Sequence, residues 1–127
     1  RGVIQFLYDY DFLRREHAIQ LSGANLKQVD LRQLELPHLN LQGADLQGAN
    51  LQYTNLYNAN LRNTNLRQAN CSYSNFYEAD LRQANLAGVN FMAAKLTAAQ
   101  VTPAQLKTVR SLENAILPDS THTVLKP

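Results

Sequence analysis

The 127-residue sequence lacks several features on which folds and active sites are often built. Cys71 is the single cysteine, so there is no disulfide framework. No apolar stretch approaches the length needed to span a bilayer. The three histidines are far apart, no Cys/His or His/Glu spacing suits a metal ion, and no glycine pattern suits a phosphate loop. We therefore expect no enzyme activity, no metal and no cofactor.

Neither sign of charge dominates the chain. It has 12 Lys and Arg against 10 Asp and Glu, with a pI near 8.8. Within residues 22–107, five acidic and seven basic residues are interspersed. A mimic of duplex DNA needs a strongly acidic surface, and direct nucleic-acid binding needs a stronger basic patch. The composition argues against both.

What the sequence does have is a strict repeat of five residues. Eighteen centres spaced five apart run from Leu21 to Leu106, and fourteen of them are leucine. The residue two positions earlier is small or apolar, and the residue directly before the centre is usually Asn or Asp, which gives the pattern A(N/D)Lxx. Cys71 occupies a centre, so we interpret it as a small buried hydrophobic residue. A fixed repeat over one domain length, with 45% hydrophobic residues, predicts a solenoid with a narrow core.

A period of five fits neither regular element. On a helix each step turns the leucine by about 140°, and on a strand it changes the face every time. A short extended segment followed by a turn keeps every leucine on one inner surface, and Asn or Asp suits such a turn. The chain therefore coils with one pentad per side, but the spacing leaves open whether three or four sides close each coil.

Segments such as 43–47 and 48–52, GADLQ and GANLQ, resemble the repeats of pentapeptide-repeat proteins over residues 22–107. The resemblance implies an all-β solenoid, a right-handed quadrilateral parallel β-helix with four pentads per coil; right-handed crossovers are also the general expectation. Some members of that family imitate DNA and bind type II topoisomerases through an acidic surface. The charge balance disfavours that alternative here.

Both ends of a β-helix expose unpaired strand edges, so we expect helical caps at the N- and C-terminal ends. Helical spacing of apolar residues predicts an amphipathic helix over residues 2–16. Thr102, Pro103 and Gln105 predict a helix start, with Thr as N-cap, for a helix over residues 103–110. We accordingly divide the chain into an N-terminal cap and entry (1–21), the repeats (22–107) and a C-terminal cap and tail (108–127).

The outer surface carries the functional hypothesis. If coils hold 20 residues, side chains 20 apart stack about 4.8 Å from one another. Tyr and Arg are enriched at binding hot spots. We predict one contiguous partner surface over the middle coils, formed by Tyr53, Tyr57, Arg62, Arg67, Tyr73, Tyr77 and Arg82. The alternative is that the stacked tyrosines only stabilise neighbouring strands.

We interpret the chain as a non-catalytic scaffold for protein–protein interaction, with no nucleic acid as partner. The alternatives are a DNA-mimic binder of type II topoisomerase and a carbohydrate or anion binder that uses the Tyr/Arg surface. The chain starts at Arg1, and its opening residues resemble repeat domains at the end of longer cyanobacterial proteins. We expect a cytoplasmic location, or membrane tethering through a longer parent chain, while the oligomeric state stays open.

Overall fold

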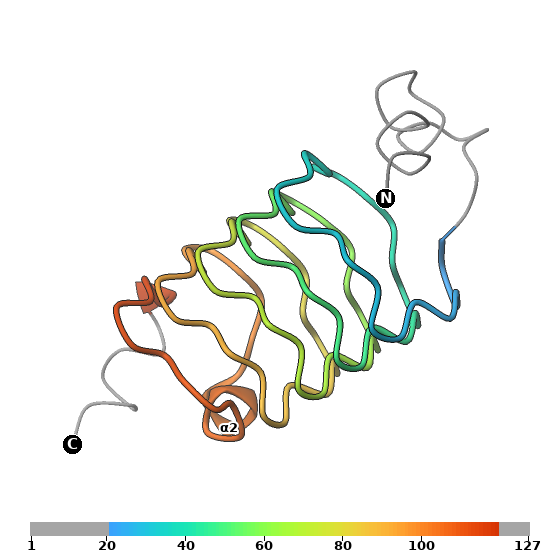
Figure 1. The fold of residues 1–127 in the computed structure, drawn as a ribbon. Coiled ribbons are helices and arrows are strands. Elements are labelled where there is room, and N and C mark those ends of the chain that lie inside the picture. Colours follow the sequence, from blue (N-terminus) through green and yellow to red (C-terminus); the bar gives the residue numbers. More distant parts are fainter. Residues whose placement is uncertain (1–20, 120–127) are drawn as a thin grey trace.

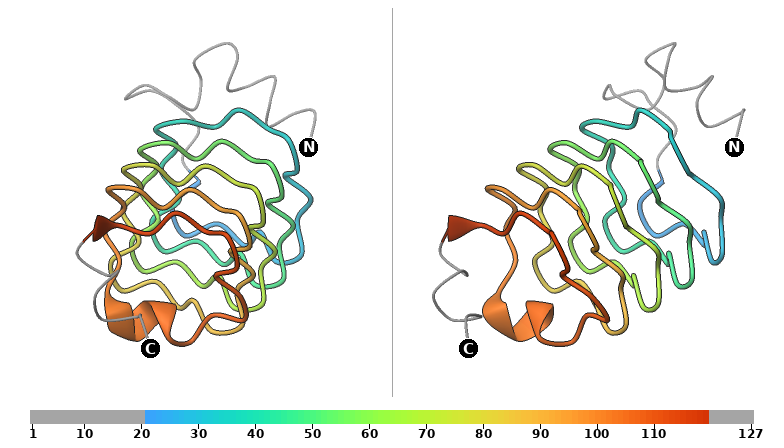
Figure 2. Two further views of the ribbon diagram at one scale, coloured as in Figure 1. Left: turned by 90° about the vertical axis from the view of Figure 1, so that its left-hand side faces the viewer. Right: turned by 60° about the vertical axis from the view of Figure 1, so that its left-hand side comes forward.

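The computed structural model describes residues 21–119, which wind as a four-sided parallel β-helix (Figures 1 and 2). Single parallel bridges join residues twenty positions apart, from Asn25 with Asp45 to Asp80 with Gln100. Twenty residues are four pentads, so four sides close each coil, which settles the number that the spacing left open. The right-handed sense of the coil stays a prediction.

Each pentad turns a corner directly after its leucine. The N–H of Ala44 donates to the carbonyl of Leu41 at 2.9 Å, which closes a four-residue turn. The third residue of the turn has positive φ, as in Gly43 (71°) and Tyr53 (58°), which is what a type II turn requires. Residues with side chains enter this region at a steric cost, so these corners are held by the rest of the coil.

The Asn or Asp before each leucine stabilises the same corner. The Oδ1 atom of Asn75 accepts a hydrogen bond from the N–H of Tyr77 at 2.9 Å, and Asn40 does the same for Gln42 at 3.0 Å. The side chain thus supplies an acceptor for a backbone donor that the turn leaves unpaired. The abundance of Asn is explained by these turns.

Backbone hydrogen bonds join each coil to the next. The N–H of Leu46 donates to the carbonyl of Asn65 at 2.7 Å, and the N–H of Asn65 donates to the carbonyl of Ala44 at 3.0 Å. The same pair of bonds recurs on successive sides. Residues in equivalent positions of successive coils are therefore held directly above one another.

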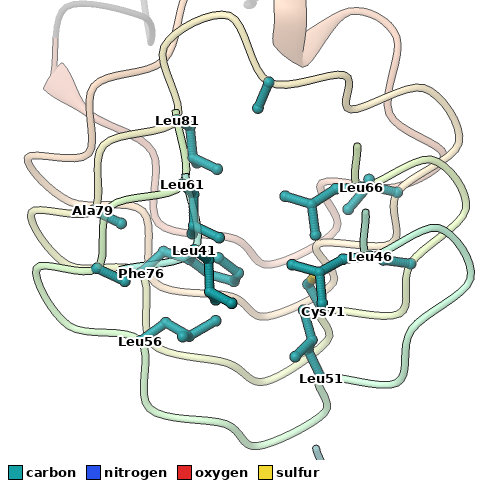
Figure 3. Packing of buried hydrophobic residues seen from close by; sticks show 14 of the residues in the cluster. Leu41, Leu46, Leu51, Leu56, Leu61, Leu66, Cys71, Phe76, Ala79 and Leu81 are labelled. Atoms are coloured by element: carbon teal, nitrogen blue, oxygen red, sulfur yellow. The ribbon is translucent and has the colours of Figure 1, made fainter. Parts of the chain in front are cut away.

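The core is a set of side-chain rows parallel to the coil axis. Figure 3 shows Leu41, Leu61 and Leu81 in one such row, and all three are fully buried. The rings of Phe76 and Phe91 pack edge to face with centroids 5.4 Å apart. The inner positions two residues before the centres are mostly small, with Leu34 and Leu39 as larger exceptions, because two inward side chains from each of four sides must share a narrow interior.

Three of these small inner positions are polar and still satisfied. The hydroxyl of Thr54 donates to the carbonyl of Leu31 at 2.7 Å, and that of Thr64 donates to the carbonyl of Leu61 at 2.8 Å. Ser74 bonds the carbonyl of Cys71 in the same way. Buried hydroxyls with such partners cost little, so Thr and Ser can replace Ala here.

At the C-terminal end the predicted helix start is confirmed. Helix α2, Pro103–Leu106, has Thr102 as its N-cap and Pro at its first turn, and Gln105 completes a capping box. The Nε2 atom of Gln105 also donates to the carbonyl of Leu81 at 2.8 Å, which ties α2 to the coil below.

The helix is shorter than the predicted 103–110 and does not close the end of the coil (Figure 1). After α2 the chain rejoins the ladder through bridges of Asn90 with Ser111 and Lys95 with Ile116. These partners are 21 residues apart, so the helical side holds one residue more than a pentad side. Bridging therefore continues past residue 107, and the division into three segments stays a prediction.

The N-terminal capping helix predicted for residues 2–16 lies outside the described residues. Within residues 21–119, no helix is both long and apolar enough to cross a bilayer.

The leucine rows generate a stability prediction. Leu66 is fully buried between Leu46 and Leu86, so Leu66→Ala should lower the free energy of unfolding by about 2–5 kcal/mol, measured by urea denaturation. Leu26 lies in the first described coil and is only partly buried, so Leu26→Ala is the matched control with a smaller loss. Equal losses would contradict the inward placement of the centres.

Cys71 gives a second prediction. It is fully buried, and that burial raises the pKa of its thiol. We expect thiol reagents to label Cys71 in native buffer only as fast as the coil opens. Arg67→Cys, at an exposed corner, should label at once. Rapid stoichiometric labelling of the unsubstituted protein would show that the centre positions are accessible.

Candidate functional site

The structure places the seven predicted surface residues on the corners of the coil. Each corner is formed by the two residues after a centre. Tyr53 and Tyr73 share one corner, Tyr57 and Tyr77 the next, Arg62 and Arg82 the third, and Arg67 lies on the fourth. The seven residues therefore surround the coil and do not form the one contiguous face that was predicted.

Two neighbouring corners do bring four of the seven together on one side. We call it the tyrosine side, and it consists of the two tyrosine corners with the outward residues between them: Tyr53, Tyr57, Tyr73, Tyr77, Glu35, Asn55, Asn75 and Lys95. The remaining three, Arg62, Arg67 and Arg82, lie on the other two corners.

The tyrosines stack in pairs across neighbouring coils. The ring centroids of Tyr53 and Tyr73 are 4.9 Å apart with planes 9° from parallel. Those of Tyr57 and Tyr77 are 5.6 Å apart with planes 8° from parallel. Tyr53 and Tyr73 are 55% and 47% exposed. Within each pair one ring covers a face of the other, so the side presents ring edges outward.

A polar strip runs between the two tyrosine corners. The amide of Asn75 donates to Oδ1 of Asn55 at 3.3 Å, and the amide of Asn55 donates to Oε2 of Glu35 at 2.7 Å. At the other end the ammonium group of Lys95 lies 5.4 Å from the ring centroid of Tyr77. The strip thus runs from the acidic Glu35 to the basic Lys95, and Ile116 follows Lys95 on the next coil.

The corner at Tyr57 carries further polar groups. The ring of His38 meets that of Tyr57 edge to face at 5.3 Å, and the Asn58 amide nitrogen lies 2.9 Å from Nδ1 of His38. The nearby charge of Glu78 raises the pKa of Tyr57, with smaller contributions from burial and from a hydrogen bond to the same carboxylate. These contacts restrain the Tyr57 ring.

On the corner that carries Arg62 and Arg82, Arg82 forms an ion pair within its own coil. Arg82 binds Asp80 in a bidentate arrangement, with Nε to Oδ1 at 2.9 Å and Nη2 to Oδ2 at 2.7 Å. This hydrogen bonding lowers the pKa of Asp80, and the charge of Arg62 acts in the same direction. Arg67 is exposed on the corner diagonally opposite Tyr57 and Tyr77.

Two groups of residues were missed in the sequence. Arg32, Gln33 and Gln52 line a hollow beside Tyr53. The Glu35 to Lys95 strip was also missed, although the same 20-residue spacing applied to the Asn/Asp positions would have found it. Within residues 21–119, no three His, Cys, Asp or Glu side chains lie together in a way that could hold a metal ion.

Comparison with known proteins gives a family match. The family model that describes pentapeptide repeats matches residues 18–52, 44–83 and 74–110 of the sequence, with 8 copies. No curated protein matches the sequence.

Among solved structures, a pentapeptide repeat protein from the thylakoid lumen of Arabidopsis thaliana superposes with a TM-score of 0.65 at 22% identity, covering 83% of this chain and 76% of that one. QnrB1, a plasmid-mediated fluoroquinolone resistance protein, superposes with a TM-score of 0.52 at 21% identity, covering 80% of this chain and 61% of that one. At these identities the likeness shows the fold alone.

The Asp80 and Arg82 pair generates a pH prediction. A lowered folded-state pKa means that the pair stabilises the protein above the unfolded pKa of Asp80 and that this contribution is lost as pH falls through the folded pKa. Arg82→Gln should raise the NMR titration midpoint of Asp80 while changing the stability at neutral pH only slightly, because Arg82 is half exposed and water screens the pair. Arg67→Gln should leave the midpoint unchanged, and a shift of equal size there would contradict the assignment.

Proposed function

The chain belongs to the pentapeptide repeat family, and from that premise we propose that it is a non-catalytic scaffold that binds another protein through its tyrosine side. The observation that carries the proposal is the presence of two stacked tyrosine pairs on neighbouring corners of one side. Tyrosine combines a large apolar ring with a polar hydroxyl group and is enriched at binding hot spots.

Rigidity supports this role. Each of the four turns that carry a tyrosine is fixed by a turn hydrogen bond, an Asn side chain and a bond to the next coil. Tyr57 and Tyr77 are also restrained by the stacking of their rings. Side chains that are already ordered lose little conformational entropy when a partner binds. A protein partner would therefore meet a preorganised surface.

The observations do not favour a DNA mimic. Such a surface needs a continuous row of uncompensated acids, whereas here the acids lie beside bases. Asp45 lies 3.6 Å from Lys27, and Asp80 lies 2.7 Å from Arg82. The likeness to QnrB1 concerns the fold alone.

A carbohydrate site is disfavoured by the ring geometry. Sugar rings pack on the exposed face of an aromatic ring, but the stacked pairs cover faces with one another and leave mainly edges outward. An anion would compete with Asp80 for Arg82. We therefore rank both below protein binding, and the cytoplasmic location stays a prediction.

The test is capture of partners with a doubly substituted protein. Tyr57→Ser with Tyr77→Ser should remove one stacked pair, lower stability by roughly 0.5–1.5 kcal/mol, and weaken recovery of partners at least tenfold if the side carries hot spots. The readout is quantitative mass spectrometry of proteins retained from a host lysate.

The matched control is Gln47→Ser with Arg67→Ser, at the same turn position on the diagonally opposite corner. It should retain all partners. Recovery of the same partners in equal amounts by the tyrosine variant would show that the stacked rings only stabilise neighbouring strands.

A further inference from the structure

We propose that a second copy of this chain binds the tyrosine side, with the two β-helices side by side and antiparallel. The inference rests on the proposed function, since it names a partner for the same surface. It is carried by the order of charges and rings along that side.

Between Glu35 and Lys95, the tyrosine side is complementary to itself about a midpoint that lies between Asn55 and Asn75. Four successive coils contribute Glu35, Asn55, Asn75 and Lys95, in that order, and the next coil adds Ile116, which is 54% exposed, beyond Lys95. Both tyrosine pairs belong to the two middle coils. The two middle coils are therefore aromatic and neutral, and opposite charges flank them at Glu35 and Lys95.

A two-fold axis that lies in the interface, perpendicular to the coil axis, brings these complementary groups of the two copies together. Such an axis reverses the order of the coils but keeps each corner opposite the same corner of the second copy. The tyrosine pairs then face tyrosine pairs, and Asn55 faces the second copy's Asn75. Glu35 faces the second copy's Lys95, and this ion pair forms twice.

Charge disfavours the parallel arrangement. A two-fold axis along the coil would bring Glu35 to the level of the second copy's Glu35, and Lys95 to the level of the other Lys95. Like charges placed opposite each other disfavour an interface. The order of charges thus selects one orientation of the two possible ones.

The end groups keep the capacity to bind across the interface. The carboxylate of Glu35 accepts a hydrogen bond from Asn55, and a carboxylate offers about four acceptor positions. Lys95 is exposed, with its ammonium group over Tyr77. At the rim, Glu78 would meet the level of Asn58, so the two copies of Glu78 lie one coil apart and not directly opposite each other.

The expected affinity follows from the size of the side. Four coils at about 4.8 Å each span less than roughly 20 Å. The three extended residues between two corners make the side roughly 10 Å wide, so its area is well below the roughly 800 Å² per partner that stable complexes bury. The pairing should therefore be weak, reversible and dependent on protein concentration.

The experiment is sedimentation equilibrium on the whole chain and two charge reversals. The unsubstituted protein should form dimers as its concentration rises. Glu35→Lys makes both ends basic and Lys95→Glu makes both ends acidic, so each variant alone should show a dissociation constant raised at least about tenfold. An equimolar mixture of the two variants should dimerise again, because each end then meets the opposite charge.

The matched control is Arg67→Glu, the same reversal of charge as Lys95→Glu on the corner away from the tyrosine side. It should dimerise like the unsubstituted protein. Thermal melts of all variants check that each is folded, since Glu35→Lys also removes a hydrogen bond to Asn55.

Three results would overturn the inference: an unsubstituted protein that stays monomeric up to roughly 1 mM, single variants that dimerise normally, or a mixture no better than its components. None of these results would contradict the proposed function. If the chain stays monomeric while the Tyr57 and Tyr77 variant loses partners from the lysate, the side binds a different protein.

Discussion

The backbone hydrogen bonds between coils are the constraint on which the rest of the structure depends. Along the regular coils, the N–H of a leucine donates to a carbonyl nineteen residues later in the chain, as Leu46 does to Asn65, and this fixes equivalent residues of successive coils above one another. The same alignment forms the leucine rows inside and the tyrosine pairs outside. Core packing and surface pattern thus follow from one register.

Much of this architecture could be predicted from the sequence, because the period of five leaves few ways to bury every leucine. The inward position of Cys71 and the N-cap at Thr102 followed from local pattern. The number of sides did not follow, since three or four extended segments satisfy the same period. The length of α2 was also missed: the extra residue of its side is accommodated between Leu106 and Leu112, where no repeat marks it.

The candidate site was predicted less completely. The spacing of 20 residues correctly predicted which side chains stack across neighbouring coils, such as Tyr57 with Tyr77. It could not show which pairs share a side, because that depends on where the corners fall within each pentad. Arg67 therefore belonged to the predicted surface yet lies on the opposite corner. The Glu35 to Lys95 strip went unnoticed because Asn and Asp at those positions were already explained by the turns.

Because all four sides are built on the same pentad, the position of a residue has two independent coordinates: the side on which it lies and the coil to which it belongs. Insertion or loss of one pentad keeps every leucine inside, yet it moves all later residues one side around the coil. Such a change would hardly affect the packing of the core. If it fell between the two coils, Tyr73 and Tyr77 would lose their stacking partners Tyr53 and Tyr57. In this fold the length of the chain in steps of five is thus a means of rearranging the surface without redesigning the interior.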